Sequence, residues 1–437
     1  MRALLPTLRA LGMADELKYT PLNELCDPER GITYGIVKVG DFVVGGVPVI
    51  RGGDIRDGRI AFDDKKRVSE EVSRKFQRTI LKGGELIINL IAEPGHVAIV
   101  PSELAGANVS RDVGVIPLND TVDHRYVSYC LKSPMAVEWL TSRLQGSVTQ
   151  KINLGTLRDL PIPVPSREHQ RAIAHFLGTL DDRIELNRRM NETLEAMARA
   201  IFKDWFVDFG PVRAKMEGRA SHLTEEVWHL FPGRLNDDGK PDGWKDSTIA
   251  QEFSLTMGQS PPGETYNESG NGLPFFQGRT DFGFRYPKRR MFCTAPTRIA
   301  EQDDTLVSVR APVGDINMAW ERCCIGRGIA AVRHRSGSRS YTYHALFSIQ
   351  SELAAFEHTG TVFGSINKGQ FGSLKILAPD DRLVAAFETT VGSIDERVRS
   401  NEAEAATLVQ IRDLLLPKLV SGEIRIKDAE KIVGEAA

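Results

Sequence analysis

The chain has 437 residues, 41% of them hydrophobic and 26% charged, which is an ordinary composition for a soluble protein of two or three domains. The formal net charge of -2 excludes a protein that attracts nucleic acid through its overall charge, so such a ligand would need local basic patches. No apolar run reaches the ~18 residues needed to span a bilayer, which excludes a transmembrane helix.

The N-terminal residues and the cysteines favour a cytoplasmic location. We predict that residues 1–14 form an N-terminal extension, which is too short and too interrupted by Pro6 and Arg9 to be a secretory signal. The cysteines are odd in number, contain no C-x-x-C pair and lie far from any histidine cluster, so neither a disulfide framework nor a zinc site is expected. They are Cys26, Cys130, Cys293, Cys323 and Cys324.

The second half of the chain repeats the first. The matching segments are VPVIRGGDI (47–55) with LPFFQGRTD (273–281), ELIINLIAEPG (85–95) with DTLVSVRAPVG (304–314), and GSVTQKINLGTLRDLPIPVP (146–165) with GTVFGSINKGQFGSLKILAP (360–379). The spacing between partners shortens along the chain, which indicates one shared architecture with loops of different length.

Each copy combines a strand-rich segment with a long helix. Short β-branched runs such as LIINLIA and IAAV, separated by Gly, Pro and Asn, predict strands, with a few short helices among them. We therefore predict an α+β fold in this order: an N-terminal extension (1–14), a first globular domain (15–165), a first long helix (166–210), a linker (211–243), a second globular domain (244–379), a second long helix (380–422) and a C-terminal tail (423–437).

The two long helices carry a seam of apolar residues in alternating steps of four and three. This repeat begins at Ile173 in the first helix and at the matching Phe387 in the second, and it is typical of a coiled coil. We predict that the helices pack antiparallel about a pseudo-twofold axis. The alternative is two amphipathic helices that each lie on their own globular domain.

An asparagine interrupts the seam where a leucine would be expected. This residue is Asn187, and its match in the second helix is Asn401. Because matching central positions meet in an antiparallel pair, we predict that the two amides face each other and fix the register of the coiled coil. The alternative is that Asn187 lies at a solvated edge of the seam.

Reactive motifs are absent from the sequence. It contains no G-x-x-x-x-G-K-[ST] phosphate loop, no G-x-G-x-x-G, no H-E-x-x-H and no G-x-S-x-G. The [DN]-P-P-[YF] tetrapeptide of amino-methyltransferases is also missing. We therefore predict no catalytic residue, no metal site and no cofactor in this chain, which favours a binding protein over an enzyme.

Two basic stretches at matching positions are the candidate binding sites for DNA. Arginine can contact guanine, and glutamine adenine, through paired hydrogen bonds, while lysine and arginine neutralise phosphates. The alternative for either stretch alone is a solvated charged surface. In residues 50–67 the candidates are Arg51, Arg56, Arg59, Lys65, Lys66 and Arg67. In residues 274–290 they are Gln277, Arg279, Arg285, Lys288, Arg289 and Arg290, and elsewhere they are Arg111, its match Arg327, and Arg310.

The two copies differ at positions suited to reading a DNA sequence. Arg51 in the first copy stands opposite Gln277 in the second. Shared positions, such as Asn153 and Asn367, are expected to be scaffold or common backbone contacts. The differing positions therefore predict that the two globular domains recognise different DNA sequences.

Several segments resemble the specificity (S) subunits of type I restriction-modification systems, and the likeness covers nearly the whole chain. The most specific are residues 160–212, which begin LPIPVPSREHQRAIAHFLG, LVSVRAPVGDI (306–316), IGRGIAAV (325–332) and LLLPKLVSGEI (414–424). The resemblance implies two target-recognition domains, each of which reads one half of a bipartite double-stranded DNA site. It also implies an antiparallel coiled coil that sets the spacer between the half-sites.

The resemblance further implies partner subunits. Two methyltransferase (M) subunits would dock on the helices and bind S-adenosylmethionine, and restriction (R) subunits would add translocation and cleavage that depend on ATP and Mg. The extra dozen residues at the N-terminus depart from the family pattern. Two alternatives remain, a coiled-coil adaptor that binds proteins without DNA and an enzyme with an unrecognised reaction centre. A steep fall of DNA affinity with salt would exclude the adaptor.

Overall fold

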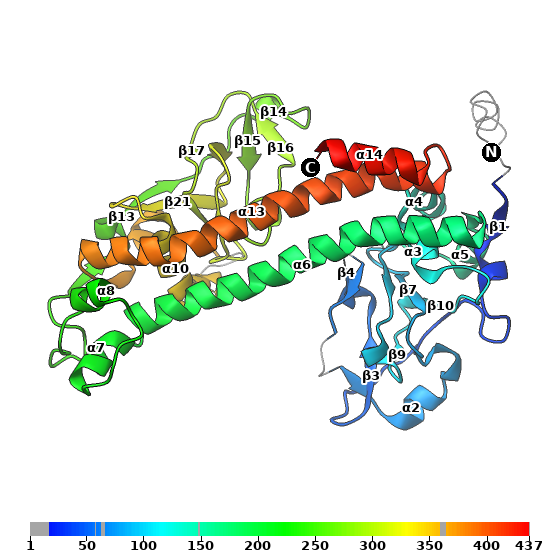
Figure 1. Cartoon of the computed structure of the whole chain (residues 1–437), viewed down its shortest axis with the longest axis horizontal. Coiled ribbons are helices and arrows are strands. Elements are labelled where there is room, and N and C mark those ends of the chain that lie inside the picture. Colours follow the sequence, from blue (N-terminus) through cyan, green and yellow to red (C-terminus); the bar gives the residue numbers. More distant parts are fainter. Residues whose placement is uncertain (1–16, 57, 63–65, 147–148, 359–363, 437) are drawn as a thin grey trace. The chain divides into compact units, whose positions relative to one another are not determined.

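The computed structural model describes residues 17–56, 58–62, 66–146, 149–358 and 364–436 (Figure 1). The chain divides into two compact units, the first formed by residues 1–187 with 403–437 and the second by residues 188–402. The predicted N-terminal extension (1–14) lies outside the described residues. None of the helices in the described part of the chain is long and apolar enough to cross a membrane.

The strands of the first unit form two main sheets and two short pairs. The four-stranded antiparallel sheet has the order β2 (Thr33–Tyr34), β10 (Val113–Ile116), β7 (Leu86–Asn89) and β8 (Val97–Ile99). The three-stranded sheet has β3 (Val47–Ile50) between the antiparallel β6 (Arg67–Val68) and the parallel β9 (Asn108–Val109). The pairs are β1 (Tyr19–Pro21) with β11 (Pro161–Pro163), and β4 (Ile55–Arg56) with β5 (Arg59–Ile60).

Strand β7 separates two cores of the first unit. Its residues are all buried, and successive side chains point to opposite faces of the sheet. Leu86 and Ile88 belong to a core that includes Val127 of a neighbouring helix, whereas Ile87 packs in a core with Ile50 of β3. The continuous apolar run in the sequence therefore reflects burial on both faces.

The helices of the first unit begin at side-chain caps. The Asp123 side chain accepts a hydrogen bond from the Tyr126 amide, and the Asn153 side chain accepts one from the Gly155 amide. The predicted C-terminal tail contains a helix whose Ala429 is buried. The helices are α2 (Glu70–Arg74), α3 (His124–Lys132), α4 (Pro134–Thr141), α5 (Leu154–Arg158) and α14 (Ile426–Ala436), with 3-10 helices η1 (Leu22–Leu25), η2 (Gly52–Asp54), η3 (Gln77–Thr79) and η4 (Ser102–Leu104).

The strands of the second unit form two main sheets and one short pair. The four-stranded antiparallel sheet has the order β13 (Phe253–Met257), β21 (Ile329–His334), β18 (Thr305–Ser308) and β19 (Ile316–Met318). The five-stranded sheet has the order β14 (Tyr266–Asn267), β16 (Met291–Cys293), β15 (Leu273–Phe276), β20 (Cys323–Ile325) and β17 (Ile299–Ala300). The pair is β12 (Lys245–Thr248) with β22 (Lys375–Ala378).

The helices of the second unit include two in the segment that we predicted as a linker (211–243). They are α7 (Gly210–Met216) and α8 (Glu225–Leu230). The others are α9 (Ile249–Glu252), α10 (Arg339–Ser348), α11 (Gln350–Ala354) and α12 (Lys368–Gly372), with 3-10 helices η5 (Gly263–Thr265), η6 (Arg279–Asp281) and η7 (Ala355–His358).

The two units share one topology, which confirms the α+β fold and the repeat. The order β2-β10-β7-β8 corresponds to β13-β21-β18-β19, and β6-β3-β9 corresponds to β16-β15-β20. The parallel pairing also recurs, because β3 runs parallel to β9 and β15 runs parallel to β20. The shared asparagines are scaffold, since Asn367 caps α12 as Asn153 caps α5.

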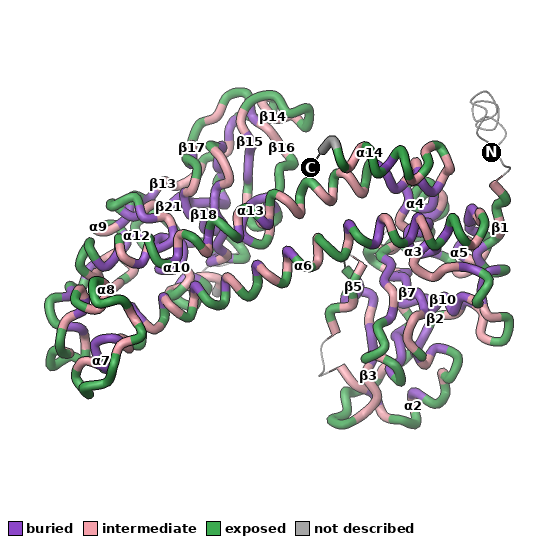
Figure 2. The backbone as a smooth tube through the Cα atoms, in the orientation of Figure 1, coloured by how far each residue is buried: buried purple, intermediate pink, exposed green. Residues whose placement is uncertain are grey.

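Two long helices lie within the ranges 166–210 and 380–422. They are α6 (Arg167–Phe206) and α13 (Asp381–Val420), of 40 residues each, and the boundary between the two units falls inside both. Buried residues recur along both helices between exposed ones (Figure 2). This pattern is the one expected of helices that bury a single seam.

The helices run antiparallel within each unit, as predicted. In the second unit Asn191 of α6 contacts Asn401 of α13, and further along α6 Phe202 contacts Phe387, which lies earlier in α13. In the first unit the same direction follows from ion pairs of Asp181 with Arg412 and of Arg183 with Glu404.

Aromatic side chains hold the helices together in the second unit. Phe387 of α13 is fully buried. Its ring centroid lies 5.5 Å from that of Phe202, 5.8 Å from that of Trp205 and 5.3 Å from that of Phe206, all on α6. The contacts are edge-to-face, the arrangement that aromatic pairs favour.

We predict that Phe387→Ala lowers the free energy of unfolding by ~3–5 kcal/mol, because it leaves a cavity among three aromatic rings. Urea denaturation followed by tryptophan fluorescence measures the change. The matched control is Leu414→Ala on the same helix, where the side chain is 53% exposed. Equal losses for the two variants would contradict the assignment of the helix core.

Candidate nucleic-acid interface

The first basic loop, residues 51–67 between β3 and β6, begins beside an exposed aromatic ring. The Arg51 guanidinium lies 4.8 Å from the centroid of the Phe42 ring. Arg56 is exposed on β4 and has no ion-pair partner among the described residues. The loop thus offers both cationic and apolar groups, which suit base edges and thymine methyl groups.

Other predicted residues of the first basic loop are held by the protein itself. Arg59 pairs with Glu185 of α6 at 2.8 Å, Lys66 Nζ pairs with Asp54 Oδ1 at 2.7 Å, and Arg67 Nη1 donates to the Gly46 carbonyl at 2.8 Å. Lys65 lies outside the described residues. The Arg59 contact ties the β4–β5 hairpin to the long helix, so this side chain has a structural partner.

The second basic loop, residues 277–290 between β15 and β16, carries its charges on the surface. Gln277 and Lys288 are exposed. The arginine side chains are each more than half exposed although they form ion pairs, Arg279 with Asp315, Arg289 with Glu321 at 2.6 Å and Arg290 with Asp281 at 3.0 Å. Exposed ion pairs are weak, so Arg279 and Arg289 can exchange a carboxylate for DNA at little cost, whereas the partner of Arg290, Asp281, is buried.

The remaining predicted arginines lie outside the two basic loops. Arg111, Arg310 and Arg327 are all exposed. Arg111 lines a cleft of about 530 Å³ together with Tyr34 and Lys151. Arg327 Nε donates to Ser260 Oγ at 3.4 Å.

Arg285 was wrongly predicted to contact DNA. Its side chain is 1% exposed and lies between two acids of the long helices, Glu195 of α6 and Asp395 of α13, the latter at 3.1 Å. The guanidinium carbon lies 3.9 Å from the centroid of the Tyr343 ring. Burial would lower the pKa of Arg285, but Tyr343, Asp395 and Glu195 raise it above its usual value. The residue is therefore a buried cation of the fold.

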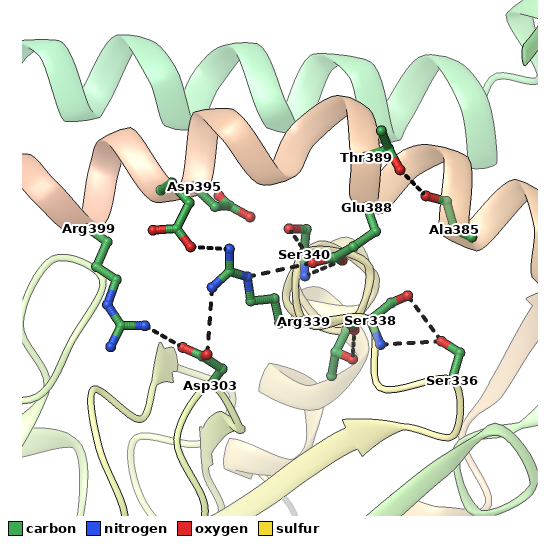
Figure 3. A network of polar contacts seen from close by, with 12 residues as sticks. Asp303, Ser336, Ser338, Arg339, Ser340, Ala385, Glu388, Thr389, Asp395 and Arg399 are labelled. Atoms are coloured by element: carbon green, nitrogen blue, oxygen red, sulfur yellow. Dashed lines mark hydrogen bonds and ion pairs between the residues drawn. The ribbon is translucent and has the colours of Figure 1, made fainter.

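A polar network continues along the face of α13 in the second unit (Figure 3). Arg399 of α13 pairs with Asp303 at 2.8 Å, and Arg339 of α10 approaches the same carboxylate at 3.6 Å. The Ser340 amide donates to Glu388 of α13 at 2.9 Å. These contacts attach α10 and the strand-rich part of the unit to the long helix.

The predicted amide pair has a different register. Asn401 Nδ2 donates to Asn191 Oδ1 at 2.8 Å, one helical turn beyond the expected Asn187. Asn191 Nδ2 in turn donates to Glu402 Oε1 at 2.8 Å. Asn187 is 1% exposed, and its Nδ2 has no hydrogen-bond partner among the described residues. Buried amides do interrupt the seam, but the partner of Asn401 is Asn191.

Comparison with known proteins finds similarity to one family. Residues 21–196 match the model of the type I restriction modification DNA specificity domain. The HindI specificity subunit of Haemophilus influenzae is 25% identical, over 86% of this chain and 94% of its own length, and the MjaIX specificity subunit of Methanocaldococcus jannaschii is 23% identical, over 90% of each. Along most of its length the chain is similar to specificity subunits of type I restriction-modification systems.

A solved structure supports the fold of this chain. The crystal structure of a type I restriction-modification S subunit from M. genitalium covers 93% of this chain and 97% of its own, with a TM-score of 0.54 and 17% identity. The family model that matches residues 21–196 describes a DNA specificity domain. Among the described residues, no group of histidine, cysteine and carboxylate side chains could hold a metal ion.

Two buried acids in the basic loops of this chain were not predicted. They are Asp54 and Asp281, which are 5% and 3% exposed. The gapless match of VPVIRGGDI with LPFFQGRTD places Asp54 opposite Thr280 and therefore hides their equivalence. A shift of one residue in that match would have revealed it.

We predict that Arg285→Ala destabilises the protein by ~3–5 kcal/mol, because Asp395 would remain buried without its cation and Glu195 would keep only its ion pair with Arg199. Urea denaturation measures the loss. Arg289→Ala, which removes an exposed cation from the same loop, is the control and costs less than ~1 kcal/mol. An Arg285→Ala variant that keeps its stability but loses preference for its DNA target would instead support the prediction that Arg285 contacts DNA.

We predict acid sensitivity from His344, which is 1% exposed. Burial, followed by the charge of Arg285, lowers the pKa of His344 from 6.5 to about 3. Below pH ~6.5 the unfolded chain binds a proton that the folded chain excludes, so stability falls as the pH falls from ~6.5 towards ~3. At pH 5 the loss is ~2 kcal/mol.

Urea denaturation at pH 7 and pH 5 tests the contribution of His344. His344→Phe should reduce the difference between the free energies of unfolding at pH 7 and pH 5 by that amount. His229→Phe, at an exposed position of the same unit, should leave this difference unchanged. The same pH dependence in the His344→Phe variant and the unaltered chain would show that His344 does not cause it.

Proposed function

We propose that this chain is the non-catalytic specificity subunit of a type I restriction-modification complex, in which each globular domain reads one half of a bipartite double-stranded DNA target. One observation carries the proposal. Two domains of the same topology present basic loops at the same place, and the loops begin with different residues, Arg51 and Gln277. Two domains with the same topology but different loop residues suit a DNA target whose two halves differ in sequence.

Affinity and specificity come from different side chains of the two basic loops. Exposed cations such as Lys288 and Arg289 contact phosphates and release counterions, which gives binding to any sequence. Arg51 and Arg279 contact the O6 and N7 atoms of guanine, and Gln277 contacts the N6 and N7 atoms of adenine. Arg285 takes no part, because its guanidinium is buried.

The long helices set the spacer between the half-sites and dock two methyltransferase (M) subunits. A helix of 40 residues is ~60 Å long, which exceeds the ~34 Å of one duplex turn. Exposed apolar side chains on these helices, Leu186, Met197 and Leu414, offer contacts for a protein partner.

The partner subunits carry out the catalytic steps. The M subunits supply S-adenosylmethionine, and restriction (R) subunits supply the steps that use ATP and Mg. All five cysteines of the chain are free and buried, which agrees with the reducing, cytoplasmic location that we propose.

We predict that Arg279→Ala weakens discrimination at the half-site of the second domain by ~1–3 kcal/mol and leaves the other half-site unchanged. The measurement is competition binding of the assembled complex to DNA altered in one half-site at a time. Arg289→Ala is the control, because loss of a phosphate contact weakens binding to all sequences and lowers its salt dependence.

An equal loss on unrelated DNA after Arg279→Ala would contradict base reading by this residue. An assembled complex that binds DNA without sequence preference, or without salt dependence, would contradict the proposed function itself.

A further inference from the structure

The buried acid of the first basic loop joins the two ends of that loop. Asp54 Oδ2 accepts a hydrogen bond from the Arg51 amide at 2.9 Å, and Asp54 Oδ1 pairs with Lys66 Nζ at 2.7 Å. The Asp54 carbonyl also accepts from the Ala61 amide at 2.7 Å. One residue therefore contacts the first position of the loop, its middle and Lys66 near its end.

The second basic loop has the same arrangement. Asp281 Oδ2 accepts from the Gln277 amide at 2.7 Å, and Asp281 Oδ1 pairs with Arg290 Nη2 at 3.0 Å. The Asp281 carbonyl accepts from the Lys288 amide at 2.8 Å. Each acid lies at the end of a 3-10 helix that follows a central strand, η2 after β3 and η6 after β15.

The recurrence is informative because the loops are otherwise dissimilar. The amide donors belong to Arg51 and Gln277, which differ in side chain and share only their position. The cations also differ, Lys66 in one loop and Arg290 in the other, yet both pair with the buried acid. The contacts of the buried acid with a backbone amide and a cation are therefore the same in both loops, although the side chains proposed to contact bases differ.

The chemistry of the acid suits a role in orientation. A charge-assisted hydrogen bond from a backbone amide to a buried carboxylate is stronger than one between neutral groups. It restricts the backbone at the residue that carries the reading side chain, and a binding group needs such support to hold its geometry. The cation offsets the negative charge that would otherwise lie near DNA phosphates.

We propose that Asp54 and Asp281 are positioning residues, each of which orients the basic loop of its own domain and so controls specificity at its own half-site. The proposal rests on the function proposed above. It assigns the acids no contact with DNA. Their effect passes through the backbone of Arg51 and Gln277.

The test uses the assembled complex and compares its affinity for the target with its affinity for DNA altered in one half-site. Asp281→Asn and Arg290→Gln should each reduce the preference at the half-site of the second domain about tenfold and leave the first half-site unchanged. Asp54→Asn and Lys66→Gln should do the converse. Because the acid and cation act as one unit, Asp281→Asn with Arg290→Gln should reduce the preference no further than either change alone.

The two repeats supply matched conservative variants. Arg290→Lys and Lys66→Arg each install the cation that the other loop uses, so they should keep the preference of the unaltered chain. Loss of a phosphate contact alone lowers affinity for all DNA and leaves the ratio of affinities unchanged, which separates positioning from charge.

An unchanged preference in the acid variants would overturn the proposal, as would an equal loss at both half-sites, since that would report general destabilisation. If Asp54→Asn or Asp281→Asn fails to assemble, the Lys66→Gln and Arg290→Gln variants decide, because they alter side chains at the protein surface. An unaltered complex without half-site preference would instead refute the proposed function.

Discussion

One acid in each unit joins the strand-rich domain to the pair of long helices, and in the second unit this junction holds a residue of the basic loop. In the first unit Asp181 of α6 accepts from the Tyr129 hydroxyl at 2.7 Å and pairs with Arg412 of α13 at 2.8 Å. In the second unit Asp395 of α13 pairs with Arg285, which stacks on Tyr343. In the second unit, where Arg285 and Asp395 are buried, removal of one partner leaves the other charge buried and unpaired, so this junction resists rearrangement.

The junctions occupy matched places in the repeat but differ in chemistry. Asp181 and Asp395 stand at the same position of LDDRIELN (180–187) and IDERVRSN (394–401). In the first unit the cation comes from a long helix, and in the second it comes from the strand-rich domain. The same duplicated scaffold has therefore acquired two sets of polar contacts, just as its loops have acquired two sets of exposed side chains.

The elements with strong local patterns were predictable from the sequence. The long helices, the α+β fold and the repeat all follow from apolar periodicity and from matched turns, which are local properties. Arg285 was predicted wrongly because the acids that bury it lie far away in the sequence, beyond what a basic stretch can reveal. The partner of Asn401 was missed by one turn, because repeat matching identifies equivalent residues but not the register at which two helices pack.

The candidate interface was predictable only in outline. The basic loops lie at matching places, as the repeat requires, but some of their cations pair with carboxylates from distant segments, as Arg59 does with Glu185. Asp54 and Asp281 escaped prediction because buried acids in a basic stretch gain their role only when the loop folds. Which exposed side chains contact bases stays a prediction, since the two loops differ at those positions.

Sequencing of methylated sites in cells that express this chain with its methyltransferase tests the central claim most directly. Two unlike readers on a duplicated scaffold predict a split motif, with two half-sites of different sequence separated by a spacer of fixed length. A continuous motif, two identical half-sites, or methylation without any sequence preference would contradict the account.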